Sequence, residues 1–174
     1  ISLIGLEDMM LYMFDNPDGL KRFMQFLSDE MNHFMDQLGT LEILGYNNGC
    51  NSVGSGNMGL TSELPSKRNP VDGPVKFSHL WGFGESQETV GVSPEMFGEF
   101  IFPYQKPLLH RFGLTYYGCC EPVEDRFTYL KQCKNLRCIS VSPWSNVEKC
   151  AELYGKDYVM CHKPNPGLVC VDFV

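Results

Sequence analysis

The sequence of 174 residues lacks features that mark two common classes of protein. No uncharged apolar run approaches the roughly 20 residues that a membrane-spanning helix needs. Basic side chains are few, 14 against 21 acidic ones, which gives a formal net charge of −7. Nucleic acids and anionic membranes both bind basic surfaces, so we expect neither among the partners of this protein.

The chain also lacks an initiating Met and a signal-peptide pattern. It begins at Ile1 without a basic segment, and its last residues, 169–174, are largely apolar. We therefore expect both ends to be cut from a longer protein. The size alone fits one domain, and an aromatic content of 13% excludes a disordered chain.

Cysteine is present, but it is sparse for a domain held together by disulfides. Such domains are usually shorter and denser in cysteine than this chain, which has eight. Cys138 and Cys161 lie in apolar runs, where a free thiol behaves as a small hydrophobic side chain. We therefore expect a reducing, cytoplasmic location.

The first 40 residues have helical periodicity. A short helix is predicted over 6–14, and Asn16 and Pro17 begin a longer amphipathic helix that ends at Gly39. Residues 45–73 differ in composition from the helical region before them, because five Gly and four Asn fall between positions 45 and 59. This stretch is too long for an ordinary connection and is interpreted as an insertion or functional loop. Its Gly-Ser-Gly run lacks the Gly-Lys-Ser/Thr ending of a phosphate-binding loop.

From residue 75 onward, predicted strands and helices alternate. The strands are expected at 76–83, 114–118, 136–141 and 158–161, with a further strand considered at 41–46. The helices are expected at 93–112, 123–132 and 145–154. Pro103 and Pro107 should kink or split the first of these helices. The alternation predicts parallel βαβ units and places the chain in the α/β class.

Polar side chains follow each of the four predicted strands. The clusters are Gly84-Glu85-Ser86-Gln87, Cys119-Cys120-Glu121, Ser142-Pro143-Trp144-Ser145-Asn146 and His162-Lys163-Pro164-Asn165. Ligands of parallel α/β folds bind at the carboxyl ends of the strands. The four clusters therefore predict a single active face.

Three segments that include residues of these clusters resemble sequence motifs of the uroporphyrinogen decarboxylase superfamily. Residues 83–104 (FGESQETVGVSPEMFGEFIFPY) are similar to its Phe-Glu-Ser, Leu-Ser-Pro and Pro-Tyr signature. Residues 115–120 (TYYGCC) lie where the methylcobalamin:coenzyme M methyltransferases of the superfamily carry a His-x-Cys-Gly zinc motif. Residues 162–166 (HKPNP) lie where they carry Gly-Asn-x-x-Pro. The resemblance covers about residues 1–170 in order.

The resemblance implies a (β/α)8 TIM barrel, of which this chain would be a partial barrel from the C-terminal part. Such barrels typically have about 250 residues, whereas four or five strands are expected here. The early strands, and the last strand with its zinc ligand, would then be missing. Exposed sheet edges of a half-barrel favour self-association, so a homo-oligomer is expected.

The resemblance also implies residue roles at the strand ends. The expected substrate-binding residues are Glu85, Ser86, Gln87, Tyr117, His162, Lys163 and Asn165. Cys119 matches the zinc-binding cysteine of the family, while Tyr117 stands in place of its histidine. A rearranged zinc site of Cys119, Cys120 and Glu121, with His162 as a further candidate, is one interpretation. The other is that both thiols are half-buried and line the pocket.

The function implied is that of a corrinoid-dependent methyltransferase, which moves a methyl group from methylcobalamin to a thiol acceptor. The insertion at 45–73 and the cysteines after the second strand favour this branch. A corrinoid protein or a small-molecule substrate would be the partner, and the fragment alone is expected to be inactive. Two alternatives stay open: a porphyrinogen decarboxylase, which needs no metal, and a non-catalytic module that binds a corrinoid protein or a ligand. No catalytic residue is assigned.

Overall fold

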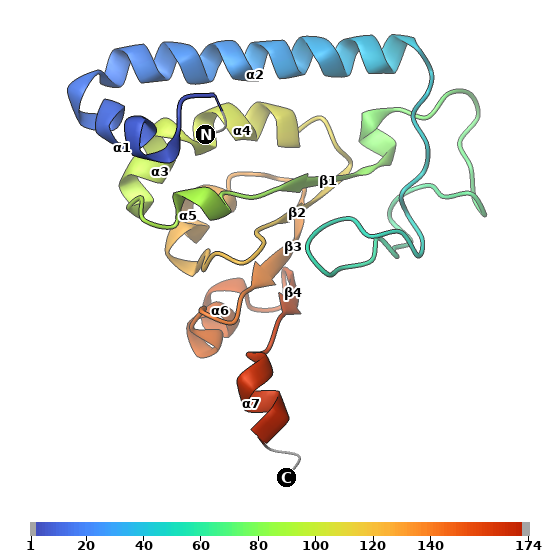
Figure 1. Ribbon diagram of the computed structural model, residues 1–174. Helices are drawn as coiled ribbons and strands as arrows, with labels where there is room; N and C mark the ends of the chain where they lie inside the picture. The colour runs from blue at the N-terminus through green and yellow to red at the C-terminus, as the bar shows by residue number, and fades with distance from the viewer. Residues whose placement is uncertain (1–2, 172–174) are drawn as a thin grey trace.

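Four parallel strands form the centre of the protein. They are β1 (Trp81–Gly84), β2 (Leu114–Tyr117), β3 (Leu136–Val141) and β4 (Val159–His162), and they lie in the order β1-β2-β3-β4. The computed structural model describes residues 3–171 and connects successive strands through helical segments (Figure 1). This arrangement confirms the predicted α/β class.

Two helices precede the sheet, as the sequence predicts. They are α1 (Leu6–Asp15) and α2 (Pro17–Thr40), and α2 runs along α4 across the top of Figure 1. The side chain of Asn16 accepts a hydrogen bond from the Gly19 amide at 3.1 Å and so caps α2. No helix among residues 3–171 combines the length and the apolar character needed to cross a bilayer.

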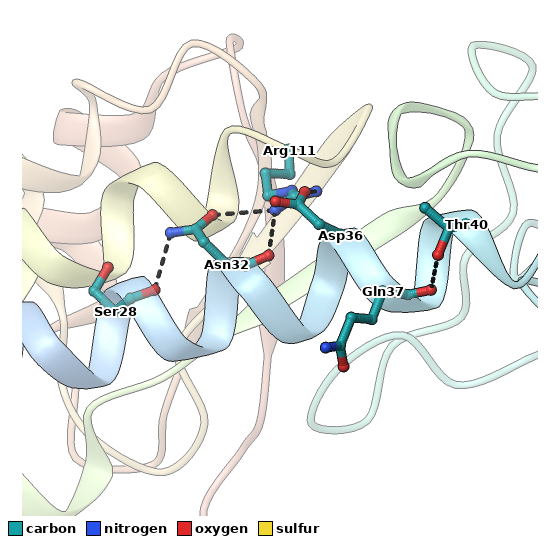
Figure 2. A network of polar contacts seen from close by, with 6 residues as sticks. All are labelled: Ser28, Asn32, Asp36, Gln37, Thr40 and Arg111. Atoms are coloured by element: carbon teal, nitrogen blue, oxygen red, sulfur yellow. Dashed lines mark hydrogen bonds and ion pairs between the residues drawn. The ribbon is translucent and has the colours of Figure 1, made fainter.

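Arg111 fastens α2 to the segment in front of β2 (Figure 2). Its guanidinium donates hydrogen bonds to the backbone oxygen and the side-chain oxygen of Asn32, at 2.9 and 3.3 Å. It also forms an ion pair with Asp36 at 2.5 Å. One planar guanidinium thus joins two turns of α2 to the chain that enters the sheet.

The helices between the strands are shorter than the sequence patterns predict. The expected helix at 93–112 divides at Ile101 into α3 (Pro94–Phe100) and α4 (Phe102–Leu109), which confirms the split ahead of Pro103. The remaining elements are η2 (Gln87–Thr89), η3 (Glu124–Arg126), α5 (Phe127–Leu130), α6 (Val147–Tyr154) and α7 (Pro166–Val171). The helix predicted over 123–132 is therefore wrong in length, and α7 was not predicted.

The strand predicted over 76–83 also begins later than expected. Its first half forms η1 (Phe77–His79), in which the ring nitrogen Nδ1 of His79 accepts a hydrogen bond from the Lys76 amide at 3.1 Å. This local bond closes a turn, so the extended backbone begins only at Trp81. His79 therefore lies outside the strand. The strand considered at 41–46 does not form.

The two faces of the sheet contribute to separate apolar cores. Tyr117, Ile139 and Val141 point toward the helices and belong to the larger core. Trp81, Tyr116 and Cys138 belong to a smaller core on the other face, together with Val53 and Leu64. Figure 1 shows the helices on one side of the sheet and residues from the 45–73 stretch on the other. We call residues 47–64 the cover segment, because they pack against this second face.

Asn47 attaches the cover segment to the outer strand of the sheet. Its side-chain oxygen accepts a hydrogen bond from the Trp81 amide, and its side-chain nitrogen donates one to the Trp81 carbonyl, both at 2.9 Å. The indole N–H of Trp81 donates to the carbonyl of Gly59 at 2.9 Å. A Cβ at Gly59 would lie 2.5 Å from the backbone oxygen of Asn47, so this approach requires glycine. The segment predicted as an insertion is thus an integral layer of the structure.

Replacing Asn47 with Ala should lower the free energy of unfolding by about 1–3 kcal/mol, because the backbone N–H and C=O of Trp81 would lose their partners. Urea unfolding measures the change. Asn51→Ala is the matched control, because the Asn51 amide makes one exposed hydrogen bond of 3.4 Å. Equal stability of the two variants would contradict the attachment role.

Alkaline pH should destabilise the protein through two buried thiols. Burial raises the pKa of Cys133 to about 11 and that of Cys138 to about 12, against about 8.5 for an exposed thiol. The unfolded chain therefore loses these protons first, and stability present below about pH 8.5 declines as the pH rises toward 11. Each thiol should contribute about 1–2 kcal/mol of this loss by pH 10.

The measurement is the urea midpoint between pH 7 and pH 10. Cys133→Ala should flatten this pH dependence, whereas Cys50→Ala should leave it unchanged, because Cys50 is exposed. If the stability of both variants falls equally as the pH rises, the Cys133 thiol does not cause the alkaline loss of stability.

Candidate functional site

A cavity of about 440 Å³ lies at the end of the sheet where β1 and β2 stop. It is lined by residues from both strand ends and from the cover segment: Asn47, Ser52, Val53, Gly54, Ser55, Trp81, Phe83, Glu85 and Cys119. The carboxyl ends of parallel strands are the usual ligand-binding edge of α/β folds. The structure therefore brings Glu85 and Cys119, two of the predicted site residues, to one cavity.

Glu121 joins the two loops that carry these residues. Its side chain is fully buried, with one carboxylate oxygen accepting from the Ser86 amide at 2.9 Å and the other from the Cys119 amide at 2.8 Å. Hydrogen bonds from backbone amides to an ionised carboxylate are about twice as strong as neutral ones. Glu121 thus sets the spacing of the loops after β1 and β2.

Arg126 fixes the same region from the helix side. This buried guanidinium donates to the Ser86 hydroxyl at 2.7 Å and to the carbonyls of Thr89 and Val92 at 2.5 and 3.2 Å. It also lies 4.7 Å from the ring centroid of Phe97. Burial lowers the pKa of Arg126, although the hydrogen bonds and the ring compensate the charge. Ser86 is therefore buried and bound to Arg126, and it does not line the cavity.

Sequence reasoning missed Arg126. The available signal was an arginine directly before the Phe127–Leu130 segment of α5, five residues after Glu121. It also missed Asn47, Ser52 and Ser55, because nothing in a Gly/Asn-rich stretch indicates which strand it will cover.

Tyr117, which stands where the resemblance expects a histidine, lies on the helix side of the sheet. Its hydroxyl donates to the side-chain oxygen of Gln105 at 2.6 Å, and the side-chain nitrogen of Gln105 donates to the backbone oxygen of Glu85 at 2.8 Å. Burial raises the pKa of Tyr117, so its hydroxyl keeps its proton. Tyr117 supports the Glu85 loop from behind and does not line the cavity.

The two adjacent cysteines differ in their surroundings. Cys119 is partly buried and donates from its thiol to the Ser55 hydroxyl at 3.2 Å, whereas Cys120 is exposed. Their sulfur atoms lie 3.6 Å apart. Burial raises the pKa of Cys119, and the neighbouring Cys120 and Glu85 side chains raise it further. The thiol of Cys119 is therefore protonated at neutral pH and forms part of the cavity wall.

The predicted zinc ligands do not assemble into a metal site. Zinc takes three protein ligands in catalytic sites. The Glu121 carboxylate is buried between the Ser86 and Cys119 amides. Among residues 3–171, no three His, Cys, Asp or Glu side chains are close enough to hold an ion together. Cys119, Cys120 and Glu121 as placed here do not fit zinc.

The remaining predicted residues lie around the cavity rather than in it. Lys163 donates from its ammonium to the Cys119 carbonyl at 2.7 Å and to the Ser140 hydroxyl at 2.9 Å. The side-chain oxygen of Asn165 accepts from the Gly167 amide at 2.9 Å, near the start of α7. His162 and Gln87 are both exposed and line no part of the cavity. Lys163 is thus a structural tie from β4 to the Cys119 loop.

Comparisons of the chain with protein-family models, curated proteins and solved structures give no significant match.

Glu121→Gln tests the junction between the two loops. A glutamine of the same shape must direct its NH₂ group at one of the two amide donors, leaving a buried N–H without an acceptor. The free energy of unfolding should fall by about 1–3 kcal/mol. Glu152→Gln, on the exposed surface of α6, is the matched control. Urea unfolding that gives the same stability for both variants would contradict the role of Glu121.

Proposed function

We propose that the chain is part of a uroporphyrinogen-decarboxylase-like (β/α)8 barrel enzyme, and that this enzyme transfers a methyl group from a corrinoid to a thiol acceptor. The parallel sheet with helical connections is compatible with a segment of such a barrel. The cavity lies at the carboxyl ends of β1 and β2, which is where barrel enzymes have their active sites. The motif residues after both strands contribute to it.

The charge of the cavity wall supports this branch of the superfamily over the decarboxylases. A porphyrinogen carries several carboxylates, which positive or hydrogen-bonding groups would have to hold. Among residues 3–171, no Lys, Arg or His lines the cavity, and its one ionised side chain is the carboxylate of Glu85. This observation carries the proposal, because an acidic wall repels a polycarboxylate but accepts a neutral or cationic reactant.

The chain's own residues would contribute binding and orientation. The cover segment and the β1 end form walls of an open cavity beside the reactant, while Glu121 and Lys163 hold the Cys119 loop in place. Zinc in the family activates the acceptor thiol, but Cys119, Cys120 and Glu121 do not fit it here, so the proposed reaction gives zinc no role. A corrinoid protein remains the proposed partner.

A non-catalytic binding module is the second candidate. Tyr117 favours this module, because it occupies the position of the zinc-binding histidine of the family. Its hydroxyl is bonded to Gln105 on the helix side of the sheet, away from the cavity. Such a module would have the same cavity, would bind a ligand there and would transfer no methyl group.

The test incubates the purified full-length protein, of which this chain is proposed to be part, with methylcobalamin and the neutral thiol 2-mercaptoethanol and measures the methylated thiol. Cys119→Ser should lower the rate at least about tenfold, because it changes the cavity wall beside the reactants; a tenfold loss corresponds to about 1.4 kcal/mol of transition-state stabilisation. Cys50→Ser, at an exposed cysteine that does not line this cavity, should retain the rate. Decarboxylation of uroporphyrinogen without methyl transfer would refute the proposal.

A further inference from the structure

The β1 strand presents a row of three side chains to the cavity. Trp81, Phe83 and Glu85 alternate along the chain and all line the cavity, as expected for residues on one face of extended backbone. The row therefore places two aromatic rings and a carboxylate in sequence along one wall.

The aromatic part of this wall is apolar, and Phe83 is its accessible member, because Trp81 is only 6% exposed. The Phe83 side chain is 43% exposed even though its ring packs against Tyr116 with centroids 5.7 Å apart. The indole N–H of Trp81 is already bonded to Gly59, so the ring offers no free donor to the cavity. Aromatic faces attract cations through their quadrupole, by an amount that grows as water is excluded.

The carboxylate of Glu85 is the negative group of this wall. None of the four ion pairs found among residues 3–171 involves it. Its backbone is held by Gln105, so the side chain extends from a fixed position. The Lys163 ammonium is committed to the Cys119 carbonyl and the Ser140 hydroxyl and is not part of the lining.

The rest of the lining is neutral. Ser52 and Ser55 supply hydroxyl groups from the cover segment, and Cys119 supplies a thiol, while the Asn47 amide is bonded to the Trp81 backbone. A volume of about 440 Å³ is within the range of about 300–1,000 Å³ for pockets that hold small molecules. The cavity thus combines one negative charge, two aromatic rings and neutral hydrogen-bonding groups.

We propose that this cavity binds a small organic cation that carries methyl groups on its nitrogen, with Glu85 opposing the charge and Phe83 and Trp81 contacting the methyl groups. The Ser52 and Ser55 hydroxyls would receive a polar tail such as a hydroxyl. The inference names a ligand class for the cavity of the proposed active site and rests on that cavity being the ligand site. It does not depend on methyl transfer or on a corrinoid.

Two probes of equal shape test the charge requirement. Choline and 3,3-dimethylbutan-1-ol differ in having a quaternary nitrogen or a neutral carbon at the same position. Titration calorimetry of the purified protein should show saturable binding of choline at least about tenfold tighter than that of the alcohol, and the difference should shrink with added salt. Equal binding of the two, binding of neither, or tighter binding of benzene-1,2,4,5-tetracarboxylate would overturn the inference.

Variants of the wall locate the binding site. Glu85→Gln keeps the size of the side chain and should abolish the preference for choline while leaving binding of the alcohol unchanged. Phe83→Leu should weaken choline binding by about 2- to 30-fold, the range of a cation–π contact. Glu88→Gln removes the same charge from a neighbouring exposed position and should bind choline as the wild type does. An equal effect of Glu85→Gln and Glu88→Gln would place the cation elsewhere and overturn the assignment.

The outcomes separate this inference from the proposed function. Choline binding that depends on Glu85, without methyl transfer to 2-mercaptoethanol, would refute the methyltransferase and keep the cation site. Methyl transfer without any preference for choline over the alcohol would refute the cation site alone. Circular dichroism and urea unfolding of Glu85→Gln confirm that the variant is folded.

Discussion

The spacing of the two strand-end loops depends on one buried carboxylate. Glu121 accepts a backbone hydrogen bond from each loop, and Arg126 holds the first loop from the helix side through the Ser86 hydroxyl. A buried charge is unfavourable unless hydrogen bonds and an opposite charge compensate it, so these groups stabilise one another. The two backbone hydrogen bonds of Glu121 thus fix the distance between the loops after β1 and β2.

Because side chains alternate along each strand, one face of the sheet packs against the helices and the other face packs against the cover segment and lines the cavity. Tyr117 and Ile139 project into the larger core with the helices, whereas Trp81 and Tyr116 project toward the cover segment. The helix side supplies rigidity, through a large core and the Arg111 contacts with α2. The opposite side supplies surface that a ligand can contact. A short sheet can serve both purposes because its strands have a period of two residues.

The sequence predicted the elements whose signals are local. The Asn16 cap, the split ahead of Pro103 and the apolar run of β3 each depend on neighbouring residues, and all three agree with the structure. The late start of β1 was missed because local hydrogen bonds between Lys76 and His79, and between Phe77 and Leu80, close a turn that apolar alternation does not reveal.

The candidate site was predicted only in part, for a related reason. Glu85 and Cys119 were found because they follow strands directly. The contact between Arg126 and Ser86 spans 40 residues, and that between Asn47 and Trp81 spans 34, so neither leaves a local pattern. The way Asn47 attaches the cover segment has a consequence for dynamics. Opening of this segment would remove one wall of the cavity while the strands stay paired. Any ligand held in the cavity therefore adds its binding free energy to the closed state. Ligand binding should then slow amide exchange in residues 47–64.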